Sequence, residues 1–125
     1  MMSSLLALND RLKYHLYRKE TDMRMGFDSL CGLVHNELGK RILDGDAFIF
    51  INRQRTHLKL LVWEKNGFTI FYRRLEMGTF EVPAFDLDAR SMQISVDQLS
   101  FMLKGISLKE IKYRKGYAHF KDKCA

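Results

Sequence analysis

The sequence predicts an α+β domain, a small antiparallel sheet of about four strands packed with two main helices. Three observations lead to this fold class: two segments with helical hydrophobic spacing, three strand-like apolar runs, and an Asn66-Gly67 pair between two of those runs. The chain has 125 residues, 46% of them hydrophobic and 29% charged, which is the composition of one globular domain.

Two amphipathic helices are expected. In the first, over residues 27–38, the apolar positions recur at steps of three and four: Phe27, Leu30, Cys31, Val34 and Leu38. Thr21 or Asp22 precedes this helix as a start signal, and Gly39 follows it as a stop signal. The second helix, over residues 96–104, begins after Ser95, and Gln98 stands at the spacing of a capping box.

The strands are expected at residues 14–19, 46–52, 57–64 and 68–75, with residues 92–95 as a further candidate. Asn-Gly is the strongest short hairpin signal, so we expect Asn66 and Gly67 to be the two central turn residues. That turn pairs Trp63 with Ile70 and Lys59 with Arg74. A four-residue loop over residues 53–56 likewise pairs Ile51 with Leu58 and Ile49 with Leu60.

This pairing makes both faces of the sheet apolar. One face carries Ile49, Ile51, Leu58, Leu60, Val62, Phe71 and Leu75, and the other carries Phe48, Phe50, Leu61, Trp63, Ile70 and Tyr72 with Lys59 and Arg74. We expect the helix at 96–104 to cover the Trp63 and Tyr72 face and the helix at 27–38 to cover the other. Both aromatic residues are then core residues. If the cover is incomplete, Trp63 and Tyr72 form a docking surface for a protein partner.

Charge and sorting signals narrow the class of protein. The net charge of +6 favours polyanionic partners, and the segment 109–125 is a basic tail rich in lysine. No apolar run reaches the ~20 residues of a spanning helix, and residues 5–8 are too short an apolar patch for a secretory signal. We therefore expect a cytoplasmic protein without membrane partners. The expected state of the cysteines is one buried thiol, Cys31, and one free thiol, Cys124.

Several blocks in fixed order, "TDMRMGFDSLCGLV", "LKLLVWEKNGF", "YRRLEMGTFEVP" and "SVDQLSFMLKGI", resemble the TnpB-type protein, the second-reading-frame product, of a bacterial insertion-sequence family, the IS sixty-six family. The resemblance covers residues 14–106. The matching positions are Asp22, Met23, Arg24, Gly26, Phe27, Arg53, Lys59, Leu61, Trp63, Gly67, Phe68, Arg74, Leu75, Glu76, Gly78, Phe80 and Pro83. The chain departs from the family pattern near Thr56 and at Glu64, Thr79 and Val82.

The resemblance implies a non-catalytic accessory protein of transposition, encoded beside a separate transposase that has the catalytic residues. The partner that the resemblance implies is that transposase. DNA is expected as a partner from the basic residues, and a second copy of the chain is a further candidate. Residues 1–13 are then an N-terminal extension, 14–108 the transposon accessory domain and 109–125 the basic C-terminal tail.

Two functions remain open. In the first, the protein binds DNA phosphates through basic side chains around the sheet: Arg24, Arg53, Arg55, Lys59, Arg73 and Arg74. In the second, it is a structural subunit that docks on the transposase or on itself through Trp63 and Tyr72 without DNA contact. Catalysis is not expected, because the carboxylates are scattered and typical of caps and turns, and the histidines show no metal-ligand spacing. No metal or other cofactor is expected.

Overall fold

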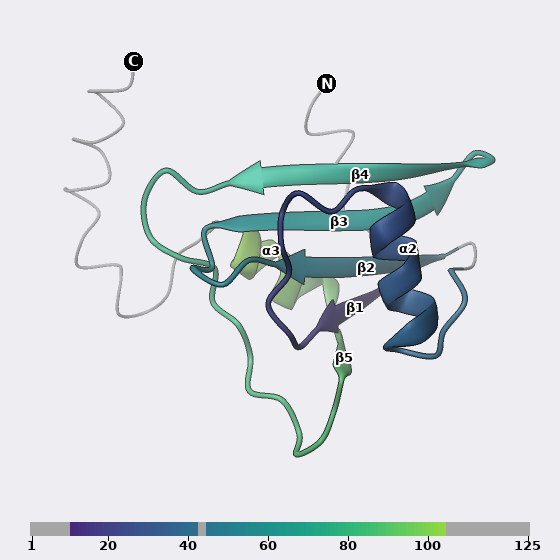
Figure 1. The fold of residues 1–125 in the computed structure, drawn as a ribbon. Coiled ribbons are helices and arrows are strands. Elements are labelled where there is room, and N and C mark those ends of the chain that lie inside the picture. The colour runs from purple at the N-terminus through teal and green to yellow at the C-terminus, as the bar shows by residue number, and fades with distance from the viewer. Residues whose placement is uncertain (1–10, 43–44, 105–125) are drawn as a thin grey trace.

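The computed structural model of the chain describes residues 11–42 and 45–104 (Figure 1). The elements follow in the order β1 (Lys13–Tyr17), α2 (Phe27–Asn36), β2 (Asp46–Ile51), β3 (His57–Glu64), β4 (Gly67–Arg74), β5 (Ser91–Ile94) and α3 (Val96–Lys104). The strands form one five-stranded sheet in the order β4-β3-β2-β1-β5. The α+β class is confirmed. The sheet has five strands rather than about four, and it is mixed because β1 runs parallel to β2.

The two helices lie on opposite faces of the sheet (Figure 1). Leu30 and Val34 of α2 pack with Phe48, Phe50 and Leu61. On the other face, α3 packs against a larger cluster that contains Ile49, Leu58, Leu60 and Val62. The expected composition of both faces is confirmed.

The expected assignment of helices to sheet faces is wrong. The face that carries Lys59, Leu61 and Ile70, together with Trp63 and Tyr72, is covered by α2 and not by α3. The reason is the pairing of β1 with β2. Parallel neighbours need a crossover, and here α2 provides it with the usual right-handed sense (Figure 1). The handedness of that crossover selects the face on which α2 lies.

The β3–β4 turn also differs from the expected one. Lys65 and Asn66, with φ of 50° and 66°, are the central turn residues, and Glu64 pairs with Gly67. Positive φ at both central positions is typical of a type I′ turn. The strands are therefore shifted by two residues from the expected pairing, so that Trp63 pairs with Phe68 and Lys59 with Tyr72.

A shift of two residues leaves every side chain on its expected face, because side chains alternate with a period of two. This explains why the faces were predicted correctly from an incorrect turn. Across the preceding loop the prediction needs no correction, since Ile51 pairs with Leu58 and Ile49 with Leu60.

The predicted N-terminal cap is present in one helix and absent from the other. The capping box of α3 is confirmed, because the backbone N–H of Gln98 donates to Ser95 Oγ (3.1 Å) and the Ser95 N–H donates to Gln98 Oε1 (2.8 Å). By contrast, α2 begins after Gly26 without a side-chain cap, so neither Thr21 nor Asp22 caps it. Gly39 lies beyond its end with φ of 61°.

Some expectations concern residues outside the described ranges. The basic tail at 109–125, Cys124 and most of the N-terminal extension belong to them. Cys31 is half-buried in α2, and its pKa is raised by desolvation and then by the charge of Asp28. Within residues 11–42 and 45–104, none of the helices combines the length and apolarity that crossing a membrane requires.

Candidate nucleic-acid interface

Several chain segments meet at one end of the sheet. The parallel strands β1 and β2 both end there, β3 begins there at His57, and β4 ends there at Arg74 (Figure 1). The loop after β1, the loop between β2 and β3, and the last residues of β4 are consequently neighbours. These segments bring together five of the predicted phosphate-binding residues: Arg24, Arg53, Arg55, Arg73 and Arg74. We call this part of the molecule the basic end.

Asn52 holds the loop that carries Arg53 and Arg55. Its side-chain oxygen accepts hydrogen bonds from the backbone N–H groups of Thr56 and His57, each at 2.9 Å. Its backbone carbonyl accepts from the N–H of Arg55 at 3.0 Å, and Arg55 has the positive φ of 60° that this tight loop requires. Sequence reasoning did not single out Asn52, although an Asn that ends a strand is a typical loop-forming residue.

A second set of bonds fastens this loop to the chain after β4. The Leu75 N–H donates to the Thr56 carbonyl (2.8 Å), and the Phe80 N–H donates to the Arg55 carbonyl (2.7 Å). The Phe80 side chain is fully buried in the α3-side core. The backbone of the arginine loop is therefore attached to the core, while the side chains of Arg53 and Arg55 are exposed.

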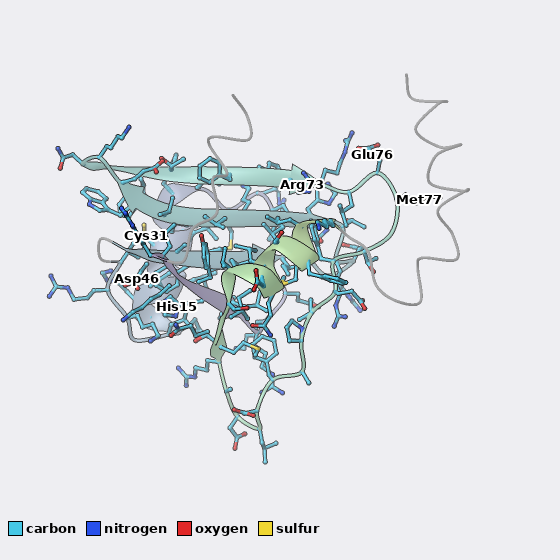
Figure 2. All side chains as sticks on the ribbon, turned by 180° about the vertical axis from the view of Figure 1, so that it is seen from behind. His15, Cys31, Asp46, Arg73, Glu76 and Met77 are labelled. Atoms are coloured by element: carbon cyan, nitrogen blue, oxygen red, sulfur yellow. The ribbon has the colours of Figure 1, made fainter. Side chains whose placement is uncertain are left out.

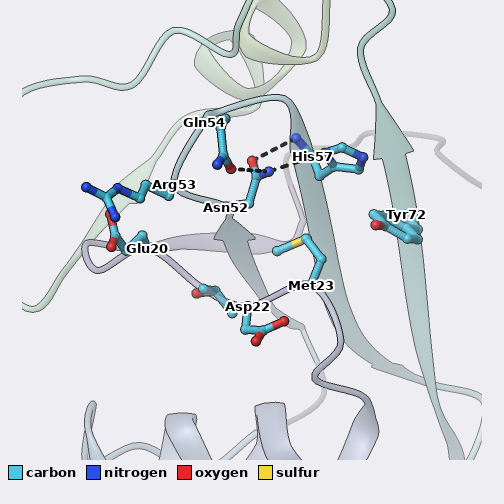
Figure 3. A pocket seen from close by; sticks show the side chains of 9 residues that line it. Glu20, Asp22, Met23, Asn52, Arg53, Gln54, His57 and Tyr72 are labelled. Atoms are coloured by element: carbon cyan, nitrogen blue, oxygen red, sulfur yellow. Dashed lines mark hydrogen bonds between the residues drawn. The ribbon is translucent and has the colours of Figure 1, made fainter.

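Arg53, Arg55 and Arg73 are the arginines of the basic end that form no ion pair with another described residue. All three are exposed, and within the described part of the chain none makes a side-chain hydrogen bond or an ion pair. Figure 2 shows Arg73 where β4 ends, near Glu76 and Met77 in the following turn and away from Asp46 at the start of β2. Glu20 lines the same pocket as Arg53 (Figure 3). Three guanidinium groups from two segments thus face solvent at one end of the molecule.

Arg24 and Arg74 already have carboxylate partners. The Arg24 guanidinium binds both oxygens of Asp22, with Nη2 2.7 Å from Oδ2, and Arg74 Nε lies 2.7 Å from Glu76 Oε2. The hydrogen bonds from the Arg24 side chain and backbone lower the pKa of Asp22 from its usual 3.8 to about 2. The net charge that these two arginines offer to a phosphate is correspondingly smaller.

Lys59 is bound by the protein itself. Its ammonium donates hydrogen bonds to the carbonyls of Met23 (2.7 Å) and Met25 (2.8 Å) and lies 4.9 Å from the centre of the Tyr72 ring. These contacts attach the loop after β1 to the sheet. Lys59 is therefore placed as a positioning residue for this loop, because two of the three N–H donors of its ammonium already bind these carbonyls.

The two residues of the proposed docking surface, Trp63 and Tyr72, lie on the same face but far apart along the strands. Trp63 is half-buried, and its ring meets the Phe68 ring edge-on at 4.8 Å. Tyr72 pairs with Lys59, four residues along β3 from Trp63, which is about 13 Å at ~3.3 Å per residue. The Tyr72 side chain is 56% exposed, so the expectation that it belongs to the core is wrong. It lies on an edge strand, beyond the cover that α2 provides.

An open pocket of about 510 Å³ lies between the two loops of the basic end (Figure 3). Glu20, Asp22 and Met23 line it from one loop, and Asn52, Arg53 and Gln54 from the other, with His57 and Tyr72 on the strands beside them (Figure 3). The pocket mixes acidic, basic and amide groups. Within the described ranges, no three His, Cys, Asp or Glu side chains are grouped in a way that could hold a metal ion.

The fold and the site define a small basic α+β protein whose chemistry-bearing side chains are arginines in the loops and at the end of an edge strand, all at one end of the sheet. Residues 12–113 match the family described as IS66 Orf2 like protein, and the chain belongs to that family. It is thus an accessory protein of an insertion sequence.

Two relatives come from Sinorhizobium fredii (strain NBRC 101917 / NGR234). The uncharacterized protein y4hO is 38% identical over 86 residues, which cover 69% of this chain and 73% of the relative. The uncharacterized protein y4jC is 25% identical over 101 residues, covering 81% of this chain and 85% of the relative. No solved structure matches the chain.

Proposed function

We propose that this insertion-sequence protein binds DNA through the basic end, with Arg53, Arg55 and Arg73 as the phosphate contacts. The observation that supports this most directly is the absence of any ion pair at these three exposed arginines within residues 11–42 and 45–104. Guanidinium groups suit phosphate because they present several N–H donors in a planar fork. The remaining three predicted contacts, Arg24, Lys59 and Arg74, have a lesser part because each already has a partner.

Phosphate contacts of this kind position a protein on DNA without reading its sequence. In this proposal the protein serves transposition as a non-catalytic factor that acts on element DNA beside the transposase, in the bacterial cytoplasm. The loop backbones support this role. Because Asn52 and Phe80 fix the arginine loop before DNA arrives, little backbone entropy is lost on binding.

The test is a gel-shift titration on element-end and random duplexes at a series of salt concentrations. The variant Arg53→Ala/Arg55→Ala/Arg73→Ala should weaken binding on both duplexes and reduce the salt slope by about 0.9 for each phosphate that the protein no longer neutralises. The matched control is Lys40→Ala/Arg41→Ala/Lys65→Ala, which removes the same charge from exposed residues near the opposite end of the sheet. Equal slopes for the two triple variants would contradict the proposed contacts.

The rival function is a structural subunit that docks on the transposase or on itself without touching DNA. The observation that favours it is the exposure of two aromatic side chains on β4, Phe68 and Tyr72. This function would be supported if the wild-type protein shifts no DNA in the gel-shift titration and co-purifies with the transposase.

A further inference from the structure

Strand β4 forms one edge of the sheet, and within the described ranges its outer side pairs with no other strand. Edge strands in natural proteins are usually short, charged, bulged or interrupted by proline, because an open edge is a template for pairing with another chain. The eight-residue strand β4 has none of these features over residues 67–72, which read Gly-Phe-Thr-Ile-Phe-Tyr. Charge appears only at Arg73 and Arg74.

The hairpin geometry determines which backbone groups of β4 point outward. Glu64 and Gly67 flank the two-residue turn and therefore form a hydrogen-bonded pair. Hydrogen-bonded and non-hydrogen-bonded pairs alternate along an antiparallel ladder. It follows that the N–H and C=O groups of Phe68, Ile70 and Tyr72 point away from β3, toward the open edge.

The side chains of the same three residues have a symmetric arrangement. They lie on the sheet face that α2 covers in part. The outer two, Phe68 and Tyr72, are 38% and 56% exposed. Ile70 stands midway between them and packs against the α2-side core. A two-fold axis through Ile70 would therefore place the exposed ring of Phe68 opposite the exposed ring of Tyr72, and would do so twice.

We propose that two copies of this chain associate by antiparallel pairing of β4 with β4 about a two-fold axis at Ile70. In this register Ile70 faces Ile70 of the second copy, and Phe68 faces Tyr72 of the second copy. Each of these pairs uses outward-pointing backbone groups and can exchange two hydrogen bonds. The exposed rings of Phe68 and Tyr72 then form aromatic cross-strand pairs between the two copies. Aromatic pairs of this kind stabilise sheets.

The charges of β4 are compatible with this register. Arg73 comes to face Gly67 of the second copy, and Arg74 comes to face Asn66, so no two arginines are directly opposed. The two basic ends point in opposite directions in the dimer, which leaves both free. A single ladder buries little surface compared with stable dimers, so the association should be weak and concentration-dependent. This inference does not depend on DNA binding.

Cysteine cross-linking tests the register. In a Cys31→Ser/Cys124→Ser background, Ile70→Cys should form a disulfide-linked dimer under mild oxidation, because facing residues of a hydrogen-bonded pair have Cα atoms about 5.5 Å apart. Phe68→Cys alone should not form a linked dimer, since the two substituted residues lie four positions apart along the paired strands. Phe68→Cys/Tyr72→Cys should form two disulfides, because residue 68 of each copy faces residue 72 of the other. Folding of each variant is checked by circular dichroism. A folded Ile70→Cys protein that fails to cross-link, or Phe68→Cys cross-linking as fast, would overturn the register.

Sedimentation equilibrium tests the association itself, on the wild-type chain from micromolar to millimolar concentration. We expect a monomer–dimer equilibrium that Phe68→Lys abolishes, because a charge on the edge strand opposes pairing. The matched control is Phe101→Lys, which makes the same change at an aromatic residue of α3 that is 51% exposed on the other face, and it should leave the equilibrium intact. A wild-type monomer throughout the range would overturn the proposal, as would equal effects of the two lysine variants. Dimer formation without DNA binding would refute the proposed function alone.

Discussion

The ammonium of Lys59 lies 4.9 Å above the Tyr72 ring, while it donates hydrogen bonds to the carbonyls of Met23 and Met25. A residue that sequence reasoning assigned to DNA is thereby a link between the sheet and the loop after β1. This loop carries Arg24 and forms one wall of the pocket at the basic end. The structure of that end consequently depends on Lys59.

Replacing Lys59 by Met should lower the free energy of unfolding by about 2 kcal/mol, because charge-assisted hydrogen bonds to two carbonyls are removed. Urea denaturation measures the change. Lys40→Met is the control, since Lys40 is exposed and makes no side-chain bond within the described residues, and it should change stability by less than about 0.5 kcal/mol. A Lys59→Met protein as stable as the control would show that these hydrogen bonds are not formed in solution.

Asp22 should give the protein an acid-sensitive element. Because Arg24 lowers its pKa in the folded protein to about 2 from 3.8, the associated stabilisation is complete above about pH 4 and is lost as the pH falls toward 2. Both side chains of the pair are exposed to solvent, so the effect should weaken with added salt.

Carboxyl NMR titration measures the Asp22 pKa directly. In Arg24→Gln it should return toward 3.8, whereas in Arg73→Gln, which removes an equal charge without contact to Asp22, it should stay near 2. An Asp22 pKa that does not respond to Arg24→Gln would exclude the ion pair as the cause.

The β3–β4 turn predicts opposite effects of substitution at two neighbouring residues. Gly67 does not have a positive φ, and a Cβ at this position would meet its nearest atom, the Glu64 carbonyl oxygen, at 4.0 Å. Gly67→Thr should therefore be neutral or stabilise the protein by about 0.5–1 kcal/mol, because Gly is unfavourable in a strand.

Asn66→Val at φ of 66° should destabilise it by about 1–2 kcal/mol, because a β-branched side chain is strained there. Thermal melting of both variants distinguishes this turn from one centred on Asn66 and Gly67. In that second turn, Gly67→Thr would be the damaging substitution.

The capping box of α3 should contribute measurably to stability. Ser95→Ala removes the acceptor of the Gln98 N–H and should lower the free energy of unfolding by about 1 kcal/mol. Ser95→Asp should retain most of the stabilisation, because its carboxylate can accept the same hydrogen bond. Ser100→Ala in the interior of the same helix is the control, and it should be neutral or slightly stabilising because Ala has the higher helix propensity. If both alanine variants unfold at the same denaturant concentration, the cap is without energetic effect.

The sequence by itself determined the features that depend on local pattern. Periodicity located both helices, and alternation assigned Phe48 and Phe50 to one face and Ile49 and Leu60 to the other. The spacing of Ser95 and Gln98 identified the cap of α3. These features are set by neighbours within a few residues, so a chain read without its fold reveals them.

Only the tertiary structure decided the features that depend on distant segments. The parallel pairing of β1 with β2 determined the face on which α2 lies, and no local pattern encodes that pairing. Likewise, whether a basic side chain is free depends on what folds against it: Lys59 is bound by carbonyls 34 and 36 positions earlier in the chain, while Arg53 has no partner within the described residues. Residue type supplies the charge, but three-dimensional proximity decides which charges remain available to a ligand.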